Sequence, residues 1–197
     1  MPIKWILLLG VLLSYFISPY LPISWGWENN LLEWLQVLIL SVGLVLNYKW
    51  YHDAKATRNT PASLLLVSAL PLWLLMIGRE LSWGRVFYPI GFDPAEGPLF
   101  LSLAELPYGA IVNPFLAIII VVWLFAVIKY GLYKIPYELL QERRFPTSEL
   151  IIAILALVIA GIGEKQLHLP VMEEFDECIA YLGLILTAYR VKSALQK

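Results

Sequence analysis

Long apolar runs separated by short polar stretches make up most of the sequence. The runs are Trp5–Ile23, Leu31–Tyr48, Ala62–Ile77, Ile111–Ile128, Leu150–Ile162 and Ile179–Val191. An α-helix rises about 1.5 Å per residue, so about 20 apolar residues cross the ~30 Å hydrocarbon layer of a bilayer. The last two runs are short, and we extend them over flanking polar residues. The pattern predicts six membrane-spanning helices, at about residues 5–23, 31–48, 62–77, 108–128, 148–165 and 171–191.

The composition supports a membrane protein. Hydrophobic residues make up 60% of the 197 positions and charged residues 15%, whereas soluble domains have about 45–50% and about 25%. The net charge of −1 does not indicate a nucleic-acid partner. Cys178 is the single cysteine, so an internal disulfide and a structural zinc site of the cysteine type are excluded. We expect an all-α polytopic membrane protein in which residues 1–197 form a single integral membrane domain, a six-helix bundle with the lipid bilayer as its main partner.

The positions of Lys and Arg predict the orientation of the helices, because these residues are enriched in cytoplasmic loops. With both termini in the cytoplasm, the residues on the cytoplasmic side are Lys4, Lys49, Lys55, Arg58, Lys129, Lys134, Arg143, Arg144, Arg190, Lys192 and Lys197. Only Arg79, Arg85 and Lys165 fall on the outer side. We therefore expect a multi-pass protein of the inner (cytoplasmic) membrane with its N- and C-termini inside.

Two connections are long enough to contain elements of their own. In the outer segment Arg79–Tyr108, the stretch Leu99–Leu106 follows Pro98, a residue suited to the first position of a helix. We expect a short interfacial helix there, between the third and fourth spans. The inner connection Tyr130–Thr147 predicts a second interfacial helix.

Carboxylates gather on the outer side. The outer set comprises Glu28, Glu33, Glu80, Asp93, Glu96, Glu105, Glu164, Glu173, Glu174, Asp176 and Glu177, and the inner set is Asp53, Glu138, Glu142 and Glu149. The helical rise places the cluster 173–177 roughly 20–26 Å above Arg190, inside the outer hydrocarbon layer. Glu33, Asn113 and Glu164 lie at a similar level by the same measure. A carboxylate in hydrocarbon costs at least ~2.5 kcal/mol, so such a group needs water, counter-ions or protons.

These depths predict an outward-facing polar chamber with a cation or proton site. The candidate site residues are Glu33, Glu80, Glu164, Glu173 and Glu177, and the candidate counter-ions or polar lining residues are Arg79, Lys165, Asn113 and Gln36. In the second helix, Glu33, Gln36, Gly43 and Asn47 share one face, which we expect to point into the protein because lipid would leave its polar atoms unpaired. His168 and Glu164, spaced i, i+4, form an alternative metal site that would be poor in nitrogen ligands.

The string GRELSWG at residues 78–84, followed by Phe87, is the most distinctive local motif. It resembles the [RE]-E-[LI]-S-W-G-x-x-F segment of uncharacterised bacterial multi-pass membrane proteins. Those proteins also tend to carry acidic residues near their final helix, as EEFDE does at 173–177. No activity is established for that group, so the resemblance implies a membrane location and no function.

Three functional classes fit these observations. The leading hypothesis is a small cation- or proton-linked transporter or channel that uses the acidic chamber, with a cation or small molecule as its substrate. The second is an enzyme acting on a lipid or lipid-linked substrate at the outer leaflet. The third is a non-catalytic membrane partner or immunity-type protein with a protein partner at the outer face. Nucleotide, haem and iron–sulfur motifs are absent from the sequence, so the sequence assigns no catalytic residue and no cofactor other than a bound cation. It favours a protein that is not an enzyme but leaves the lipid enzyme open, because acid–base catalysis by carboxyl groups needs no sequence motif.

Overall fold

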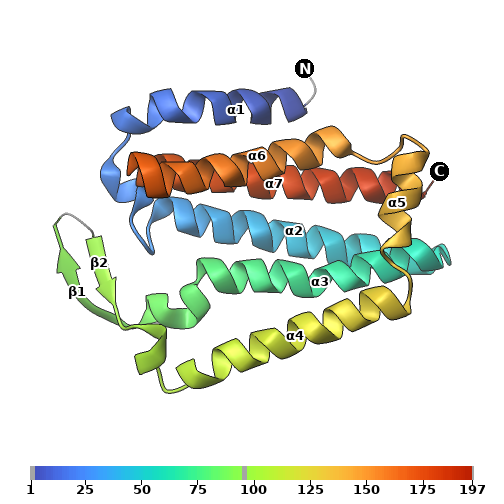
Figure 1. Ribbon diagram of the computed structural model, residues 1–197, viewed down its shortest axis with the longest axis horizontal. Helices are drawn as coiled ribbons and strands as arrows, with labels where there is room; N and C mark the ends of the chain where they lie inside the picture. The colour runs from blue at the N-terminus through green and yellow to red at the C-terminus, as the bar shows by residue number, and fades with distance from the viewer. Residues whose placement is uncertain (1–2, 95–96, 197) are drawn as a thin grey trace. The chain divides into compact units, whose positions relative to one another are not determined.

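Six long apolar helices dominate the structure, a computed structural model that describes residues 3–94 and 97–196 (Figure 1). Their bounds are Ile3–Ile17 for α1, Leu31–Ala56 for α2, Thr60–Glu80 for α3, Gly109–Lys129 for α4, Thr147–Ile162 for α6 and Pro170–Leu195 for α7. Counted with the short turns that prolong α1 and α6, each is long and apolar enough to cross a membrane. The six predicted helices are therefore confirmed, and the all-α fold class with them. Glu96 and Lys197, which the sequence places outside and inside, lie beyond the described residues.

Two helix ends differ most from the prediction. The first helix stops at Ile17 and continues only as the 3-10 turn η1 (Ser18–Tyr20), because Pro19 cannot donate a backbone hydrogen bond; the 3-10 turn η2 (Ile23–Gly26) follows. The second difference is in α2, which continues through polar residues to Ala56, beyond the predicted end at residue 48. It ends just before Arg58, which has a φ of 56°, and Asn59 then caps α3 by accepting a hydrogen bond from the Ala62 N–H at 3.2 Å.

The predicted helix at Leu99–Leu106 is wrong. After the irregular 3-10 segment η3 (Ser82–Phe87), strands β1 (Pro89–Asp93) and β2 (Gly97–Phe100) form an antiparallel hairpin in which Phe92 pairs with Pro98 and Gly91 with Leu99. Only Leu103–Glu105 is helical, as the single 3-10 turn η4. The apolar stretch fits either structure by composition, but Gly97 has a φ of 89° and lies against the Trp27 ring, where a Cβ would come within 2.6 Å. The inner connection does contain the expected short helix, α5 (Lys134–Gln141).

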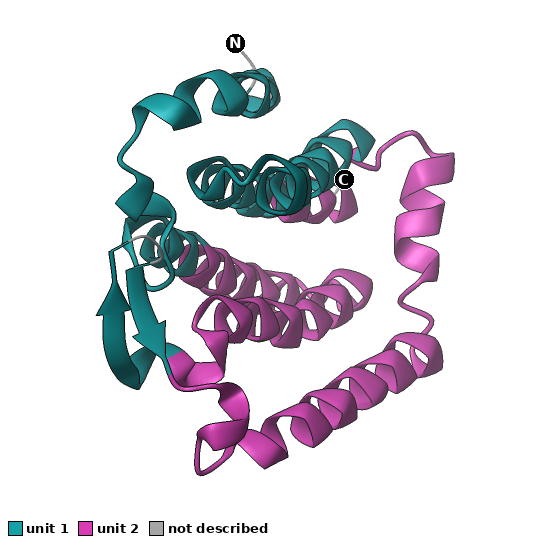
Figure 2. Ribbon diagram, turned by 60° about the vertical axis from the view of Figure 1, so that its left-hand side comes forward, with its two compact units in different colours: residues 1–39, 86–100, 147–187 teal, residues 40–85, 101–146, 188–197 magenta. Residues whose placement is uncertain are grey.

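The chain divides into two compact units (Figure 2). Unit 1 comprises residues 1–39, 86–100 and 147–187, and unit 2 comprises residues 40–85, 101–146 and 188–197. Helices α2 and α7 each contribute residues to both units.

The core of unit 1 joins the first helix to the last two. Leu7 and Val11 of α1 pack with Ile152 and Ala156 of α6 and with Ile179 and Ala180 of α7. Small residues let these helices approach closely, as in many membrane helix pairs. A Cβ at Gly10 would lie 2.9 Å from Ile179 Cδ1, and a Cβ at Gly183 would lie 2.9 Å from Ala153 Cβ.

Unit 2 is held together by a core and by side-chain hydrogen bonds to helix carbonyls. Trp50 and Ala54 of α2 pack on Ala62 and Leu66 of α3. The C-terminal carbonyls of α7 are also bound, because the Asn59 side chain donates to Leu195 O at 2.7 Å and Arg144 donates to Ala194 O. Such bonds satisfy carbonyls that have no partner within a helix.

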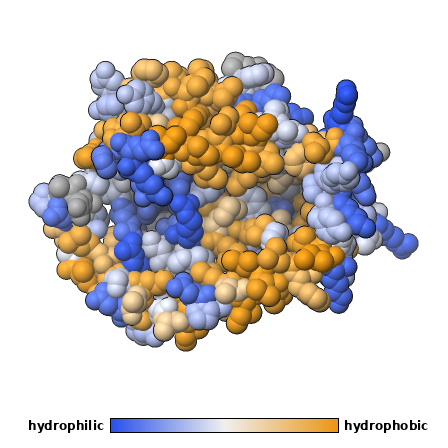
Figure 3. Space-filling model, viewed as in Figure 1, coloured by the Kyte–Doolittle hydropathy of each residue, from blue (hydrophilic) through white to orange (hydrophobic). Residues whose placement is uncertain are grey.

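Helix α4 is apolar along most of its length, and among its residues only Gly109, at its start, is buried. A hydrogen bond from Trp123 Nε1 to Ser68 O, 2.8 Å long, links it to α3. Between the two helices lies an apolar cavity of about 610 Å³, with Pro71, Leu75, Trp83, Phe115, Ile119 and Val122 among its lining residues. Hydrophobic residues cover the visible surfaces of α1 and α4, and hydrophilic residues gather around α5 (Figure 3). This surface suits α4 for contact with lipid.

Candidate functional site

The N-terminal half of α7 carries four carboxyl groups within unit 1. The helix begins at Pro170, and its first acidic residue, Glu173, lies in the first turn, where a negative charge interacts favourably with the helix dipole. Glu173 and Glu174 are half-buried, whereas Asp176 and Glu177 are buried. The sequence analysis named Glu173 and Glu177 as site residues, and the structure adds Asp176, whose exposed fraction is 0%.

Asp176 is joined to the first helix by Ser14, which is also buried. The Ser14 Oγ lies 2.9 Å from Asp176 Oδ2 and 2.8 Å from the backbone oxygen of Val11. Within the described ranges 3–94 and 97–196, the second carboxyl oxygen, Oδ1, has no hydrogen-bond partner. A buried carboxylate normally accepts several hydrogen bonds, so this one is short of donors.

The two oxygen atoms next to Ser14 also need more protons than its one hydroxyl group supplies. A serine hydroxyl carries a single proton and can donate it to one acceptor at a time. Here two oxygen atoms, Val11 O and Asp176 Oδ2, lie within hydrogen-bond distance of the same hydroxyl. If the hydroxyl donates to Val11 O, the contact with Asp176 needs a proton on the carboxyl group.

A second polar link joins α7 to α2. Gln36, with an exposed fraction of 0%, donates from Nε2 to the Glu174 backbone oxygen at 3.0 Å and to Glu174 Oε2 at 2.6 Å. Its own Oε1 has no partner among the residues that the structure describes. The expectation that Gln36 and Asn47 point into the protein is confirmed, since both are fully buried, and the Asn47 Nδ2 donates to Leu66 O at 2.7 Å within unit 2.

Three candidate residues of unit 1 lie exposed on η5, the π-helical turn Gly163–Leu167, or directly after it. These residues are Glu164, Lys165 and His168, the last with a φ of 52°. Among the described residues, no group of three or more His, Cys, Asp or Glu side chains is placed to hold a metal ion. The pairing of His168 with Glu164 on a metal stays a prediction.

Glu33 has a local structural role at the start of α2. Its Oε2 accepts a hydrogen bond from the Asn29 N–H at 2.6 Å, and Asn30 Oδ1 accepts one from the Leu31 N–H at 2.7 Å. Together these acceptors satisfy backbone donors at the helix N-terminus, which otherwise have no partner. Glu33 is half-buried.

The remaining candidates lie in unit 2. Glu80 is buried at the end of α3 and pairs with the exposed Arg79 at 2.9 Å, whereas Asn113 is exposed on α4. The convergence of these three residues with the carboxyls of α7 in one chamber stays a prediction.

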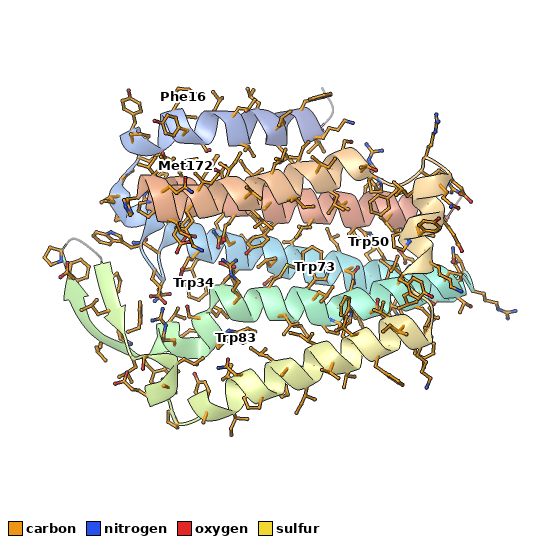
Figure 4. All side chains as sticks on the ribbon, viewed as in Figure 1. Phe16, Trp34, Trp50, Trp73, Trp83 and Met172 are labelled. Atoms are coloured by element: carbon orange, nitrogen blue, oxygen red, sulfur yellow. The ribbon has the colours of Figure 1, made fainter. Side chains whose placement is uncertain are left out.

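The GRELSWG motif has a structural explanation in unit 2. Trp83 and Gly84 have φ values of 56° and 90°, so the chain reverses directly after α3. The Trp83 ring, labelled in Figure 4, then lies against Gly78, where a Cβ would come within 2.3 Å of it. Gly84 lies against the Tyr108 hydroxyl, where a Cβ would come within 2.5 Å. The glycines of the motif therefore allow two aromatic side chains to contact the backbone.

The comparisons with known proteins do not assign a function. Among the family models, curated protein sequences and solved structures compared with the chain, none matches it. The functional argument therefore depends on the buried polar groups of unit 1. Sequence reasoning did not select Asp176 or Ser14 as a site residue. Ser14 does stand out in the sequence, because it and Tyr15 are the polar residues of the otherwise apolar stretch 5–17.

Proposed function

We propose that this protein is a small proton-linked membrane transporter or channel in which Asp176 of α7 is the proton-binding group. The observation that carries the proposal is the contact between Asp176 and Ser14. The carboxyl group is fully buried in an apolar helix pair, one of its oxygens has no partner among the described residues, and the other shares a single hydroxyl proton with Val11 O. A neutral, protonated carboxyl satisfies both contacts of the Ser14 hydroxyl, because it donates to Ser14 Oγ while Ser14 donates to Val11 O.

A carboxyl group in this environment suits proton binding better than docking. An ionisable side chain inside a membrane-spanning segment is costly when charged, which favours a group that gains and loses a proton. A surface that binds a partner protein needs exposed groups, and Asp176 has none of its surface exposed. The half-buried Glu173 and Glu174 and the buried Glu177 would supply further proton or cation ligands around it.

We further propose that the protein lies in the cytoplasmic membrane with both termini inside. The distribution of Lys and Arg along the sequence supports this orientation. In this orientation the carboxyls of α7 lie in the outer half of the membrane.

Proton flux into liposomes tests the function. The purified protein is reconstituted with a pH-sensitive dye inside the vesicles, and flux is driven by a pH gradient or by a potassium diffusion potential. We expect wild-type flux well above that of protein-free vesicles, and a loss of about tenfold or more in Asp176→Asn, whose side chain is neutral and of similar size. The matched control is Asp53→Asn, at an exposed position of α2, which should keep wild-type flux.

Two outcomes would contradict the proposal. One is an Asp176→Asn protein that is folded and carries protons as fast as the wild type. The other is wild-type vesicles that acidify no faster than protein-free vesicles, with or without added Na⁺, K⁺ or Ca²⁺.

A further inference from the structure

Helix α1 and its 3-10 extension place two buried serines one turn apart. Ser14 and Ser18 are separated by four residues and therefore lie on the same face, about 5–6 Å apart between Cβ atoms. Their exposed fractions are 1% and 5%. Ser14 contacts Asp176, whereas the Ser18 Oγ has no hydrogen-bond partner in the described part of the chain. A buried hydroxyl without a partner is uncommon and indicates a water molecule or ligand.

A small cavity lies at Ser18. Its volume is about 130 Å³, and its lining includes Ser18, Pro19, His168, Leu169, Pro170 and Val171. Water occupies about 30 Å³ per molecule in the liquid, so the cavity has room for about four water molecules. Figure 4 shows Phe16 and Met172, neighbours of the lining residues, at the same end of unit 1.

The position of the cavity relates it both to water and to Asp176. On its side towards η5, the polar residues Glu164, Lys165, Gln166 and His168 are exposed, as expected for a segment outside the hydrocarbon layer. On its other side, Val171 precedes Asp176 by five positions in α7, about 7.5 Å along the helix axis. Ser18 and Ser14 cover the same interval along α1. The two serines thus lie between the cavity and the carboxyl group.

We propose that this cavity is the water-filled entrance through which protons from outside reach Asp176. The inference rests on the proposed function of Asp176. A hydronium ion in the cavity gives up a proton and becomes water, and an ionised Asp176 receives a proton on Oδ2 and becomes a carboxylic acid. Each serine hydroxyl accepts one proton on its oxygen and releases its own, so it is unchanged after the transfer. Because Ser18 Oγ makes no hydrogen bond to Ser14 within the described residues, a water molecule of the cavity bridges the two hydroxyls and passes the proton on in the same way. For the last step the Ser14 O–H turns from Val11 O to Asp176 Oδ2, two acceptors that lie at 2.8 and 2.9 Å.

The exchange of the Asp176 proton for deuterium measures this access directly. The infrared C=O stretch of a protonated carboxyl shifts when the proton is replaced by deuterium, and the band of Asp176 is identified by its loss in Asp176→Asn. After rapid transfer to D₂O, we expect Ser18→Leu, which fills the cavity, to keep the band and to slow its shift by about tenfold or more, equivalent to a barrier raised by about 1.4 kcal/mol. The matched control is Ser193→Leu, where the hydroxyl donates to Tyr189 O of its own helix, and there the shift should keep its wild-type rate.

A second variant closes the cavity after folding. In a Cys178→Ala background, Ser18→Cys is treated with a small, membrane-impermeant methanethiosulfonate reagent and later with a reductant. We expect the modification to slow the exchange and the reduction to restore it. An exchange rate unchanged by Ser18→Leu, or a Ser18→Cys protein that does not react from outside, overturns the entrance while the Asp176 band remains. If no band is lost in Asp176→Asn, the protonated carboxyl is wrong, and the entrance fails with it.

Discussion

Gln36 and Glu174 are joined twice across unit 1, because the Gln36 Nε2 lies 3.0 Å from the Glu174 backbone oxygen and 2.6 Å from its Oε2. One amide group therefore binds a main-chain carbonyl and a carboxylate of the same residue. The link fixes the rotation of α7 relative to the first part of α2. That rotation directs Asp176, two positions further along, towards Ser14 of α1.

Replacing Gln36 by methionine tests this link. The variant Gln36→Met keeps a side chain of similar size but removes both donors. Since hydrogen bonds to charged groups contribute about 1.5–3 kcal/mol, we expect the free energy of unfolding in detergent to fall by about that amount. The matched control is Gln166→Met on the exposed turn η5, which should leave stability unchanged. Equal stabilities of the two variants would show that the link is unimportant for folding.

The packing of Trp83 on Gly78 predicts strong coupling between the two positions. Gly78→Ala places a Cβ within 2.3 Å of the ring, and we expect it to lower stability by about 1–3 kcal/mol. In a Trp83→Ala background the same change should be neutral or stabilising, because alanine favours helices over glycine by about 1 kcal/mol. A double-mutant cycle from thermal or urea unfolding gives the coupling energy. Gly161→Ala is the matched control, because its Cβ meets nothing within 4 Å. Additive effects at Gly78 and Trp83 would contradict the observed contact.

Asn59 has two separable roles in unit 2. Its Oδ1 caps α3 at the Ala62 N–H, and its Nδ2 donates to Leu195 O at the end of α7. Asn59→Ala removes both bonds, and we expect a loss of about 1–3 kcal/mol. Asn59→Asp keeps the acceptor and removes the donor, so it should lose less and should increase hydrogen exchange mainly at the C-terminal end of α7. Asn113→Ala, at an exposed position, provides the control for an asparagine substitution. Faster exchange at the start of α3 in Asn59→Asp would contradict this division of roles.

The proposed orientation is testable by cysteine labelling. Gln166 and Thr57 are both exposed and follow the C-terminal ends of α6 and α2, which the proposed orientation places on opposite sides of the membrane. In a Cys178→Ala background, Gln166→Cys should react with an impermeant maleimide in intact spheroplasts, and Thr57→Cys should react only after the membrane is permeabilised. The Cys178→Ala protein without an added cysteine should stay unlabelled. The reverse labelling pattern would place both termini outside.

The carboxyl group of Glu105, in the segment between α3 and α4, predicts a local dependence of stability on pH whose direction is known. The Ser102 hydroxyl donates to Glu105 Oε2 at 2.7 Å and the Ser102 N–H donates to it at 2.8 Å, and both bonds lower the pKa of this carboxyl from its ordinary value. Because the pKa of Glu105 is lower in the folded than in the unfolded state, its ionised carboxylate stabilises the fold at pH values above the ordinary pKa. This stabilisation is lost as the pH falls through the lowered pKa of the folded state. Carbon NMR of labelled glutamate should show the Glu105 pKa rising in Ser102→Ala. An unchanged titration would show that the hydroxyl bond does not form in solution.

The sequence predicts the six helices well, because apolar runs such as Ile111–Ile128 have no alternative structure of the same length in a membrane. It does not predict the β1–β2 hairpin. Leu99 and Phe100 suit a helix or a strand, and their pairing depends on Pro89 and Gly91 and on the left-handed conformation of Gly97. These contacts join separate segments, so they cannot be predicted from the residues of one stretch alone.

The candidate site, too, is predicted only in part from the sequence. The helical rise from Arg190 predicts that carboxyls near residue 175 lie within the hydrocarbon layer, but a helical wheel does not separate Glu173, Glu174, Asp176 and Glu177. Asp176 is distinguished by Ser14, a partner from the other end of the chain. Similarly, GRELSWG is recognisable as a motif, but its dependence on the fit between Gly78 and Trp83 requires coordinates.

The core of unit 1 combines α1 with α7, a helix that the ribosome makes much later. Ser14 and Asp176 are 162 residues apart, so at about 5–20 residues per second the first helix waits on the order of 10–30 s for its partner. During this time α1 sits in the bilayer with Ser14 exposed to lipid or to temporary neighbours. Chains that terminate before α7 would keep this helix unpaired, and a membrane protease or insertase that recognises a lone polar hydroxyl in an apolar helix could distinguish them from finished molecules. The pairing of α1 with α7 is therefore a late step in the biosynthesis of this protein, separated from the synthesis of α1 by more than 150 residues.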